Sequence, residues 1–193
     1  MILPTREESL ALLREHTQAD HLLKHMLAVE AAMVGQARRL GGDPELWGRT
    51  GLLHDMDYER HPTPAEHPYV GVEILRGRGY PEEMLRAILS HADYSGVARG
   101  TPMEHALYAV DELSGFVVAC ALVRPSRSLD DLTPRSVQKK FKSKAFAAGV
   151  KREDCLRGAG ELGLDFDTHV ANLIEDLRPA QESLGLERAG GTG

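Results

Sequence analysis

Apolar residues recur at spacings of three and four along most of this chain, which is the pattern of amphipathic helices. The clearest segment lies at about residues 20–40, whose apolar stripe consists of Leu22, Met26, Val29, Met33 and Ala37. Strands would show a sustained alternation of apolar and polar residues, rich in β-branched side chains, and the sequence contains no such stretch. The pattern therefore predicts an all-α protein.

Residues typical of helix starts divide this pattern into elements. Glu8 follows Thr5 by three residues, which predicts a capping box, and Asp43 precedes Pro44, a common pairing in the first turn of a helix. The segment 58–68 contains three prolines and is expected to be a loop, and 126–133 is expected to be a linker. We expect helices at about residues 5–14, 20–40, 43–53, 68–76, 81–91, 102–123, 133–148, 152–162 and 167–184.

The chain is expected to form one helical-bundle domain. Its 193 residues lie within the usual size of a single domain, and no repeat of fixed period is visible. We place the domain at residues 1–186, with a core at about 20–123 and C-terminal helices at about 133–184. The tail 187–193 is polar and rich in glycine, and we expect it to be disordered.

Composition narrows the possible partners. A net charge of −6 and a pI near 5.8 argue against a general nucleic-acid binder, so we expect no nucleic-acid polymer as partner. No window approaches the roughly 20 apolar residues of a membrane span, and we expect no membrane association. Two cysteines, Cys120 and Cys155, do not make a disulfide scaffold, which favours a reduced cytoplasmic setting. The apolar run at 116–118 and the C-terminal helices are candidates for a homodimer surface.

Histidines and aspartates form the main chemical signal. His54-Asp55 ends an expected helix, and since neighbouring helical side chains point about 100° apart, one metal can reach both only near a helix end. His25 and Asp111 are set among apolar residues, where an unsatisfied polar group would be costly. Each residue alone has an ordinary structural explanation, such as a core histidine or a solvated aspartate. The weight lies in the ordered set His25, His54-Asp55, His67, His91 and Asp111.

This set resembles the signature of the HD superfamily of metal-dependent phosphohydrolases, small bacterial HD/HDIG-domain proteins among them: a histidine, a His-Asp pair and a distant aspartate on a helical bundle. The resemblance covers about residues 20–123. It implies that His25, His54, Asp55 and Asp111 bind a first metal. It also implies that His67 and His91 complete a second site, with Asp55 bridging the two ions.

Imidazole and carboxylate ligands suit Mn, Fe, Co, Ni or Zn, with Mg also possible. One or two such ions would activate water for attack on phosphorus. We therefore expect a hydrolase that cleaves a phosphate ester or anhydride of a small phosphorylated metabolite, namely a nucleotide. Two alternatives stay open: a di-iron oxygenase with the same ligand set, and a non-catalytic module that binds a metal or a nucleotide.

Other residues are candidates for catalysis and substrate binding. Asp57 follows the catalytic candidates His54 and Asp55, and we expect it to transfer a proton or to support a metal ligand. The basic segment 135–148 reads first as a solvated helix face. The alternative is that its lysines, with Arg124 or Lys151, reach the metal site and hold phosphate, which makes the substrate-binding candidates Lys139, Lys140, Lys144 and Arg124.

Overall fold

The computed structural model describes residues 3–188, and every regular element in that range is a helix. The prediction of an all-α protein is therefore confirmed. The α-helices are α1 (Arg6–His16), α2 (Asp20–Leu40), α3 (Pro44–Leu53), α4 (Tyr69–Gly77), α5 (Glu82–His91), α6 (Pro102–Leu122), α7 (Pro134–Phe141), α8 (Arg152–Glu161) and α9 (Phe166–Leu177). Two short 3-10 helices, η1 (Asp93–Ser95) and η2 (Arg178–Ala180), complete the list.

The expected start signals operate as capping contacts. The Thr5 hydroxyl accepts a hydrogen bond from the Glu8 N–H at 3.2 Å, and the Glu8 carboxylate accepts one from the Thr5 N–H at 2.7 Å. This reciprocal pair is the capping box that the sequence predicts. The Asp43 carboxylate caps α3 in a similar way by accepting from the Glu45 N–H at 2.9 Å.

Two helices end earlier than expected. α7 ends at Phe141 rather than near 148, because the guanidinium of Arg152 donates to the carbonyls of Phe141 at 3.4 Å and Ser143 at 3.2 Å. These bonds satisfy carbonyls that a longer helix would have paired. α9 ends at Leu177, and Pro179 stands in the following 3-10 turn, where its missing N–H stops the helix.

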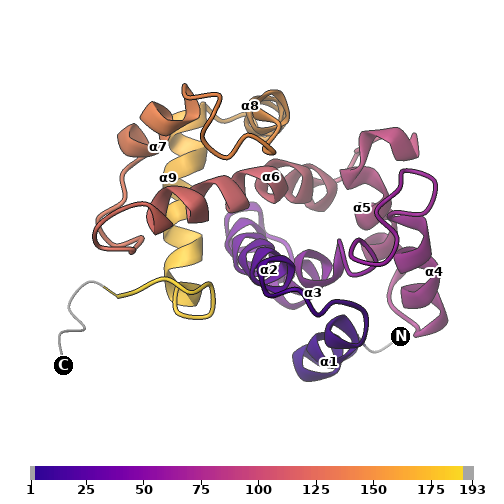
Figure 1. Cartoon of the computed structure of the whole chain (residues 1–193). Coiled ribbons are helices and arrows are strands. Elements are labelled where there is room, and N and C mark those ends of the chain that lie inside the picture. The colour runs from indigo at the N-terminus through magenta and orange to yellow at the C-terminus, as the bar shows by residue number, and fades with distance from the viewer. Residues whose placement is uncertain (1–2, 189–193) are drawn as a thin grey trace.

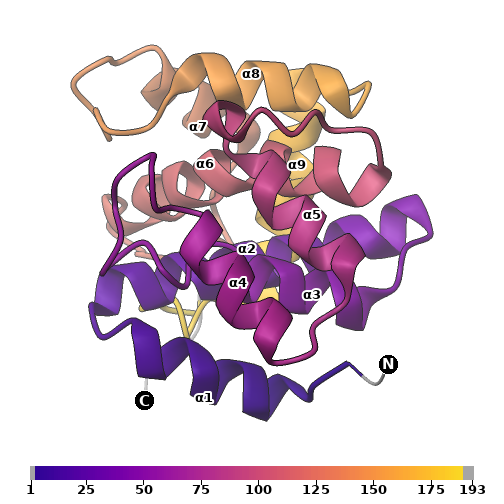
Figure 2. The ribbon, with the colours of Figure 1, turned by 90° about the vertical axis from the view of Figure 1, so that its right-hand side faces the viewer.

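α2 and α6 are the two longest helices and form the centre of the molecule. In Figures 1 and 2, α1 and α8 lie at opposite ends with α2, α3 and α6 between them, while α9 packs across α2 and α6. The buried apolar side chains form two clusters. One lies around α2, α6 and α9, with Phe116 at its centre, and the other lies around α1, α3, α4 and α5, with Leu53. Side chains of α2, α3, α5 and α6 therefore meet between the two clusters.

α6 is long and apolar enough to cross a membrane by length and composition alone. In the structure 61% of its apolar window is buried, and it packs against α2, α5, α8 and α9. That is the arrangement of a core helix. Phe116 and Val117 of this helix are fully buried, so the expectation that they offer an apolar surface to a second copy is wrong.

The C-terminal segment is ordered as far as the structure describes it. The Glu187 N–H donates to the Arg127 carbonyl at 2.9 Å, so the expected disorder does not begin at 187. Residues 189–193 of the expected tail lie outside the described part of the chain.

Candidate metal centre

Six side chains from three helices and the segment between α3 and α4 converge at one place. His25 comes from α2, His54 caps the end of α3, and Asp55 follows it. His67 precedes α4, His91 is the last residue of α5, and Asp111 lies in the middle of α6. The structure thus brings together all six residues of the predicted metal set, in three overlapping groups whose ligand atoms lie within 4.8 Å of one another.

Asp55 stands at the centre of the cluster. Its Oδ1 atom lies 3.5 Å from Nε2 of His54 and 3.3 Å from Nε2 of both His67 and His91. The other oxygen, Oδ2, lies 3.9 Å from Nε2 of His25. One carboxylate therefore faces four imidazoles, which is the arrangement needed for a bridging ligand.

Asp111 closes the cluster from α6. Its Oδ1 atom lies 3.1 Å from Nε2 of His25 and 3.3 Å from Nε2 of His54. His25 and His54 are thereby shared between the two carboxylates. None of the three groups of ligand atoms contains all six side chains. The full set could therefore hold one ion or two.

A close approach of α2 and α3 makes this convergence possible. A Cβ atom at Gly51 would lie 2.7 Å from the Val29 carbonyl oxygen, so only glycine lets α3 pack against the α2 backbone at this distance. α3 then ends at Leu53, and Tyr58 N donates to the Asp55 carbonyl in the turn that follows. The chain leaves the helix at this point, which lets His54 and Asp55 face the same centre.

Three of the histidines have their Nδ1 atoms engaged elsewhere. Nδ1 of His54 lies 2.8 Å from the Gly51 carbonyl, and Nδ1 of His91 lies 2.5 Å from the Ile88 carbonyl. A carbonyl can only accept, so both rings donate from Nδ1, and Nε2 is the nitrogen that faces the carboxylates and is placed for a metal. Nδ1 of His67 is likewise bonded to Asp57 at 2.8 Å. Metal-binding histidines commonly make such a contact with the nitrogen that does not bind the ion.

The polar atoms at the centre are not satisfied by protein contacts. Nε2 of His54 and Oδ1 of Asp55 are buried and have no hydrogen-bond partner among the described residues. A buried polar atom left in this way costs about 1–3 kcal/mol. A divalent cation between them would satisfy both atoms, and nitrogen and oxygen donors suit a transition ion. The residues present therefore fit a metal.

The electrostatics point the same way. Burial opposes ionisation of Asp55 and Asp111, but the imidazole of His54 and the other histidines outweigh it and hold both carboxyl pKa values below their usual range. Burial also opposes protonation of His67, yet its bonds to Asp55 and Asp57 raise its pKa to about 9. The carboxylates thus require nearby positive charge, which protonated histidines or a metal can supply.

Asp57 lies behind the metal ligands. Its side chain is 1% exposed, and its two oxygens accept hydrogen bonds from Nδ1 of His67 and from the Gly71 N–H at 2.7 Å. It does not line the cleft. This position supports the alternative in which Asp57 orients a ligand, since a carboxylate without access to the cleft has no route to a substrate proton.

A cleft of about 560 Å³ opens onto the cluster. Five of the six metal candidates line it, while His54 is buried behind them. The other polar or aromatic lining residues include Tyr58, Asp93, Tyr94, Tyr108, Glu112, Lys151 and Asp154. A site of this volume accommodates a small organic ligand.

The basic residues proposed for substrate binding lie elsewhere, with one exception. Lys139, Lys140, Lys144 and Arg124 do not line the cleft. α7 ends at Phe141, Lys140 lies 4.9 Å from the Phe146 ring, and Arg124 pairs with Asp131 at 2.6 Å. The lining of the cleft thus gives no support to their expected role in substrate binding. Lys151 does line the cleft, because the loop held by Arg152 brings it there.

Some of the cleft residues could not be identified from the sequence, and Tyr94 and Asp154 show the physical reason. Tyr94 and Asp154 lie in segments without a recognisable motif, and only the packing of α8 against α6 and the turn after α5 bring them to the cleft. No spacing within the sequence carries that information.

Comparisons with known proteins agree with this geometry. The family model described as the HD domain matches residues 22–116. Ribonuclease Y 2 of Levilactobacillus brevis is 27% identical over 174 residues, which is 85% of this chain and 31% of that protein. Ribonuclease Y of Alkaliphilus metalliredigens is 33% identical over 73 residues, 37% of this chain and 15% of the relative.

Ribonuclease Y of Lactobacillus acidophilus is 32% identical over 90 residues, 46% of this chain and 17% of the relative. The chain thus spans less than a third of the length of these curated relatives. No solved structure matches the chain at a comparable level of significance.

Proposed function

Because the chain belongs to the HD-domain family of metal-dependent phosphohydrolases through residues 22–116, we propose that it hydrolyses a phosphate ester or anhydride of a nucleotide-sized metabolite. The observation that carries the proposal is the pair of orphaned buried atoms, Nε2 of His54 and Oδ1 of Asp55, at the floor of a cleft. An atom pair of this kind is suited to a cation rather than to further protein contacts.

The six candidate ligands fall into two sets, one for each ion. His25, His54, Asp55 and Asp111 would hold one ion, and His67 and His91 would extend the site to a second, with Asp55 shared. Such ions lower the pKa of bound water and polarise phosphoryl oxygens. Asp57 fixes the ring of His67 through its Nδ1 atom, so that Nε2 stays directed at the centre.

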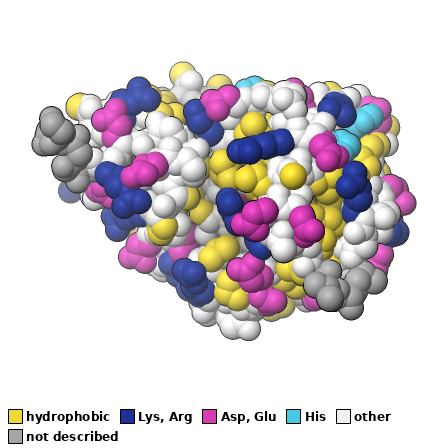
Figure 3. Space-filling view, turned by 90° about the horizontal axis from the view of Figure 1, so that it is seen from below, with side chains coloured by type: hydrophobic (Ala, Val, Ile, Leu, Met, Phe, Trp, Pro, Cys, Tyr) yellow, Lys and Arg dark blue, Asp and Glu magenta, His cyan; other side chains and the backbone are white. Residues whose placement is uncertain are grey.

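The cleft favours a small substrate over a polyanion. Five carboxylates line it and Lys151 is its one lysine, so any phosphate is attracted mainly by the bound ions. Figure 3 shows acidic and basic side chains interspersed over the face seen from below, without a basic stripe there. Proteins that bind nucleic acid through its backbone usually concentrate lysine and arginine on one face. The relatives named ribonucleases make a short RNA a necessary comparison in the test.

The test combines metal analysis with turnover. We expect the purified protein to hold one or two transition ions per chain and to release phosphate from a nucleotide in a panel that also contains sugar phosphates and a short RNA. Asp55→Ala should lose both the ions and the turnover, whereas Asp167→Ala, on the exposed side of α9, should keep both.

Three results would argue against the proposal. Wild-type turnover in Asp55→Ala would remove the metal from the mechanism. Oxygen consumption without phosphate release would favour the di-iron oxygenase. Strong thermal stabilisation by metal with no turnover of any compound would leave a binding module.

A further inference from the structure

The exposed aromatic side chains of this protein are concentrated at the metal cleft. Tyr58 is 40% exposed and Tyr94 is 50% exposed, and both line the cleft. The remaining aromatic residues in the described range are buried or half-buried. Exposed aromatic rings gathered at a concave site are a common mark of ligand binding.

Tyr58 packs against one of the candidate metal ligands. Its ring packs edge-on against the His67 ring, with centroids 5.2 Å apart and an interplanar angle of 85°. It follows Asp55 by three residues, in the turn where its N–H donates to the Asp55 carbonyl at 3.0 Å. A ligand whose phosphate lies at Asp55 would therefore place its next chemical group beside this ring.

Tyr94 lies in η1 (Asp93–Ser95), the turn after α5. Its neighbour Asp93 accepts a hydrogen bond from Nη1 of Arg99 at 2.9 Å and a further one from Arg157. Arg99 also donates to the Ser90 carbonyl at 3.0 Å. The turn that carries Tyr94 is thus attached to both α5 and the segment before α6.

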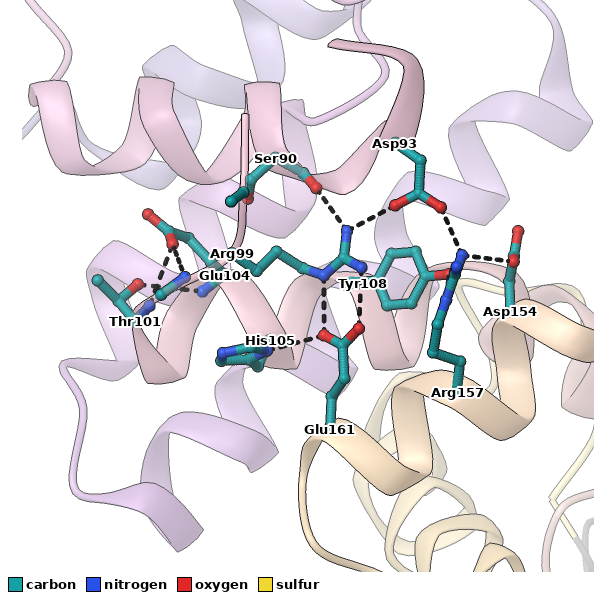
Figure 4. A network of polar contacts seen from close by, with 12 residues as sticks. Ser90, Asp93, Arg99, Thr101, Glu104, His105, Tyr108, Asp154, Arg157 and Glu161 are labelled. Carbon is teal, nitrogen blue, oxygen red and sulfur yellow. Dashed lines mark hydrogen bonds and ion pairs between the residues drawn. The ribbon is translucent and has the colours of Figure 1, made fainter. Parts of the chain in front are cut away.

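The network behind this turn is extensive. Arg99 donates to both oxygens of Glu161 on α8, at 2.8 and 2.9 Å, and its guanidinium carbon lies 3.6 Å from the centroid of the Tyr108 ring. Figure 4 shows the Tyr108 ring between Arg99 and Arg157, with Asp93 bonded to both arginines. Bidentate, partly buried contacts of this kind hold a turn in place. Tyr94 is therefore exposed on a fixed support, and little ordering would be needed when it binds a ligand.

The polar residues of the cleft can bind the sugar and phosphate of a ligand whose flat ring lies at the cleft entrance. Glu112 and Asp154 supply acceptors for sugar hydroxyls or ring amino groups, and Lys151 supplies a cation for a phosphate oxygen. The metal ligands lie at the floor and the tyrosines at the rim. A nucleotide has its phosphate, sugar and flat base in the same order.

We propose that Tyr58 and Tyr94 form an aromatic platform on which the base of a nucleotide stacks while its phosphate lies at the metal ligands. This inference rests on the proposed function and names the part of the site that selects the substrate. Stacking of a base on an aromatic ring tolerates many bases, so the platform distinguishes nucleotides from sugar phosphates more sharply than it distinguishes one base from another.

The experiment compares two substrates that differ only by a base. Adenosine 5′-monophosphate and ribose 5-phosphate are hydrolysed by the metal-loaded full chain and by the variants Tyr58→Leu, Tyr94→Leu and their combination. Replacing a stacking ring should raise KM for the nucleotide about 10-fold or more relative to any change in KM for ribose 5-phosphate. Tyr58→Phe and Tyr94→Phe are matched controls that keep the ring, and they should bind the nucleotide as the wild type does.

Each outcome decides one question. Equal losses for both substrates, or Phe variants that behave like the Leu variants, would overturn the platform and leave the phosphohydrolase in place. A short RNA whose cleavage is lost in the Leu variants alone would support the platform with the base of an RNA nucleotide as its ligand.

If no phosphorylated compound is turned over, the proposed function fails, and calorimetry decides on the platform. Tighter binding of the nucleotide than of ribose 5-phosphate, lost in the double Leu variant, would support the platform. Equal binding of the two compounds would overturn it.

Discussion

Gly51→Ala tests whether the close contact of α2 and α3 builds the metal centre. The new Cβ atom would lie 2.7 Å from the Val29 carbonyl oxygen and 2.9 Å from its carbon. Ordinary contacts begin near 3.4 Å, so the helices must separate by several tenths of an ångström. Overpacking of this kind costs about 1–3 kcal/mol, against a gain of up to about 1 kcal/mol from helix propensity. We expect a net loss of about 1–2 kcal/mol.

The assay measures two consequences of the same displacement. Each kcal/mol corresponds to about 2–4 °C in Tm for a chain of this size, so the melting temperature should fall by several degrees. Metal content should fall as well, because His25 on α2 would move away from His54 at the end of α3.

Gly160→Ala is the matched control for Gly51→Ala. Nothing lies within 4 Å of the Cβ position at Gly160 in α8, and helix propensity alone should stabilise this variant by up to about 1 kcal/mol. If Gly51→Ala were as stable and as rich in metal as Gly160→Ala, the close contact would not be a condition of the site.

Three further predictions follow from individual contacts. Asp57→Asn should weaken metal binding about 10- to 100-fold, as loss of such a supporting carboxylate commonly does, and a metal titration measures this. Burial lowers the pKa of His169, so below pH 6.5 the unfolded chain takes up a proton that the folded chain resists. Stability should therefore fall with pH below that point, and less steeply in His169→Leu, which urea denaturation at pH 7.5 and 5.0 would detect. Lys140→Ala should leave KM for the substrate within about twofold of wild type in steady-state kinetics, since Lys140 lies outside the cleft.

The convergence of the candidate metal ligands was predictable because the signal lies in the order of a few residue types. His25, His54-Asp55 and Asp111 are polar residues at positions that helical periodicity places on buried faces, and a buried polar group must have a partner. Their convergence then follows from the bundle. Neither Pro68 nor the expected helix end at His91 indicated a buried polar residue. The predicted roles of His67 and His91 as metal ligands therefore rested on family resemblance alone.

Which lysine lines the cleft could not be predicted from the sequence, because it depends on where α7 ends. A continuous helix over 133–148 would have placed Lys140 and Lys144 on one face, four residues apart. Arg152 instead donates to several carbonyls of the segment 141–150 and turns it into a loop. Lys140, in α7, does not line the cleft, whereas the end of that loop brings Lys151 to it. Contacts between a side chain and distant carbonyls have no counterpart in local sequence patterns.

The exposure of Tyr94 at the cleft could not be predicted from the sequence either. An exposed tyrosine and a core tyrosine look alike in a sequence, and the four residues that fix the turn at 93–95 come from three different segments. Arg99 reaches Glu161 of α8 only once α8 packs against α6. Arg157 of the same helix likewise reaches Asp93 only in the folded chain. The candidate metal ligands are therefore encoded in a motif, whereas the exposed residues at the rim of the cleft are brought there by tertiary contacts. Variants of the rim should consequently change which substrate is chosen without removing the ions.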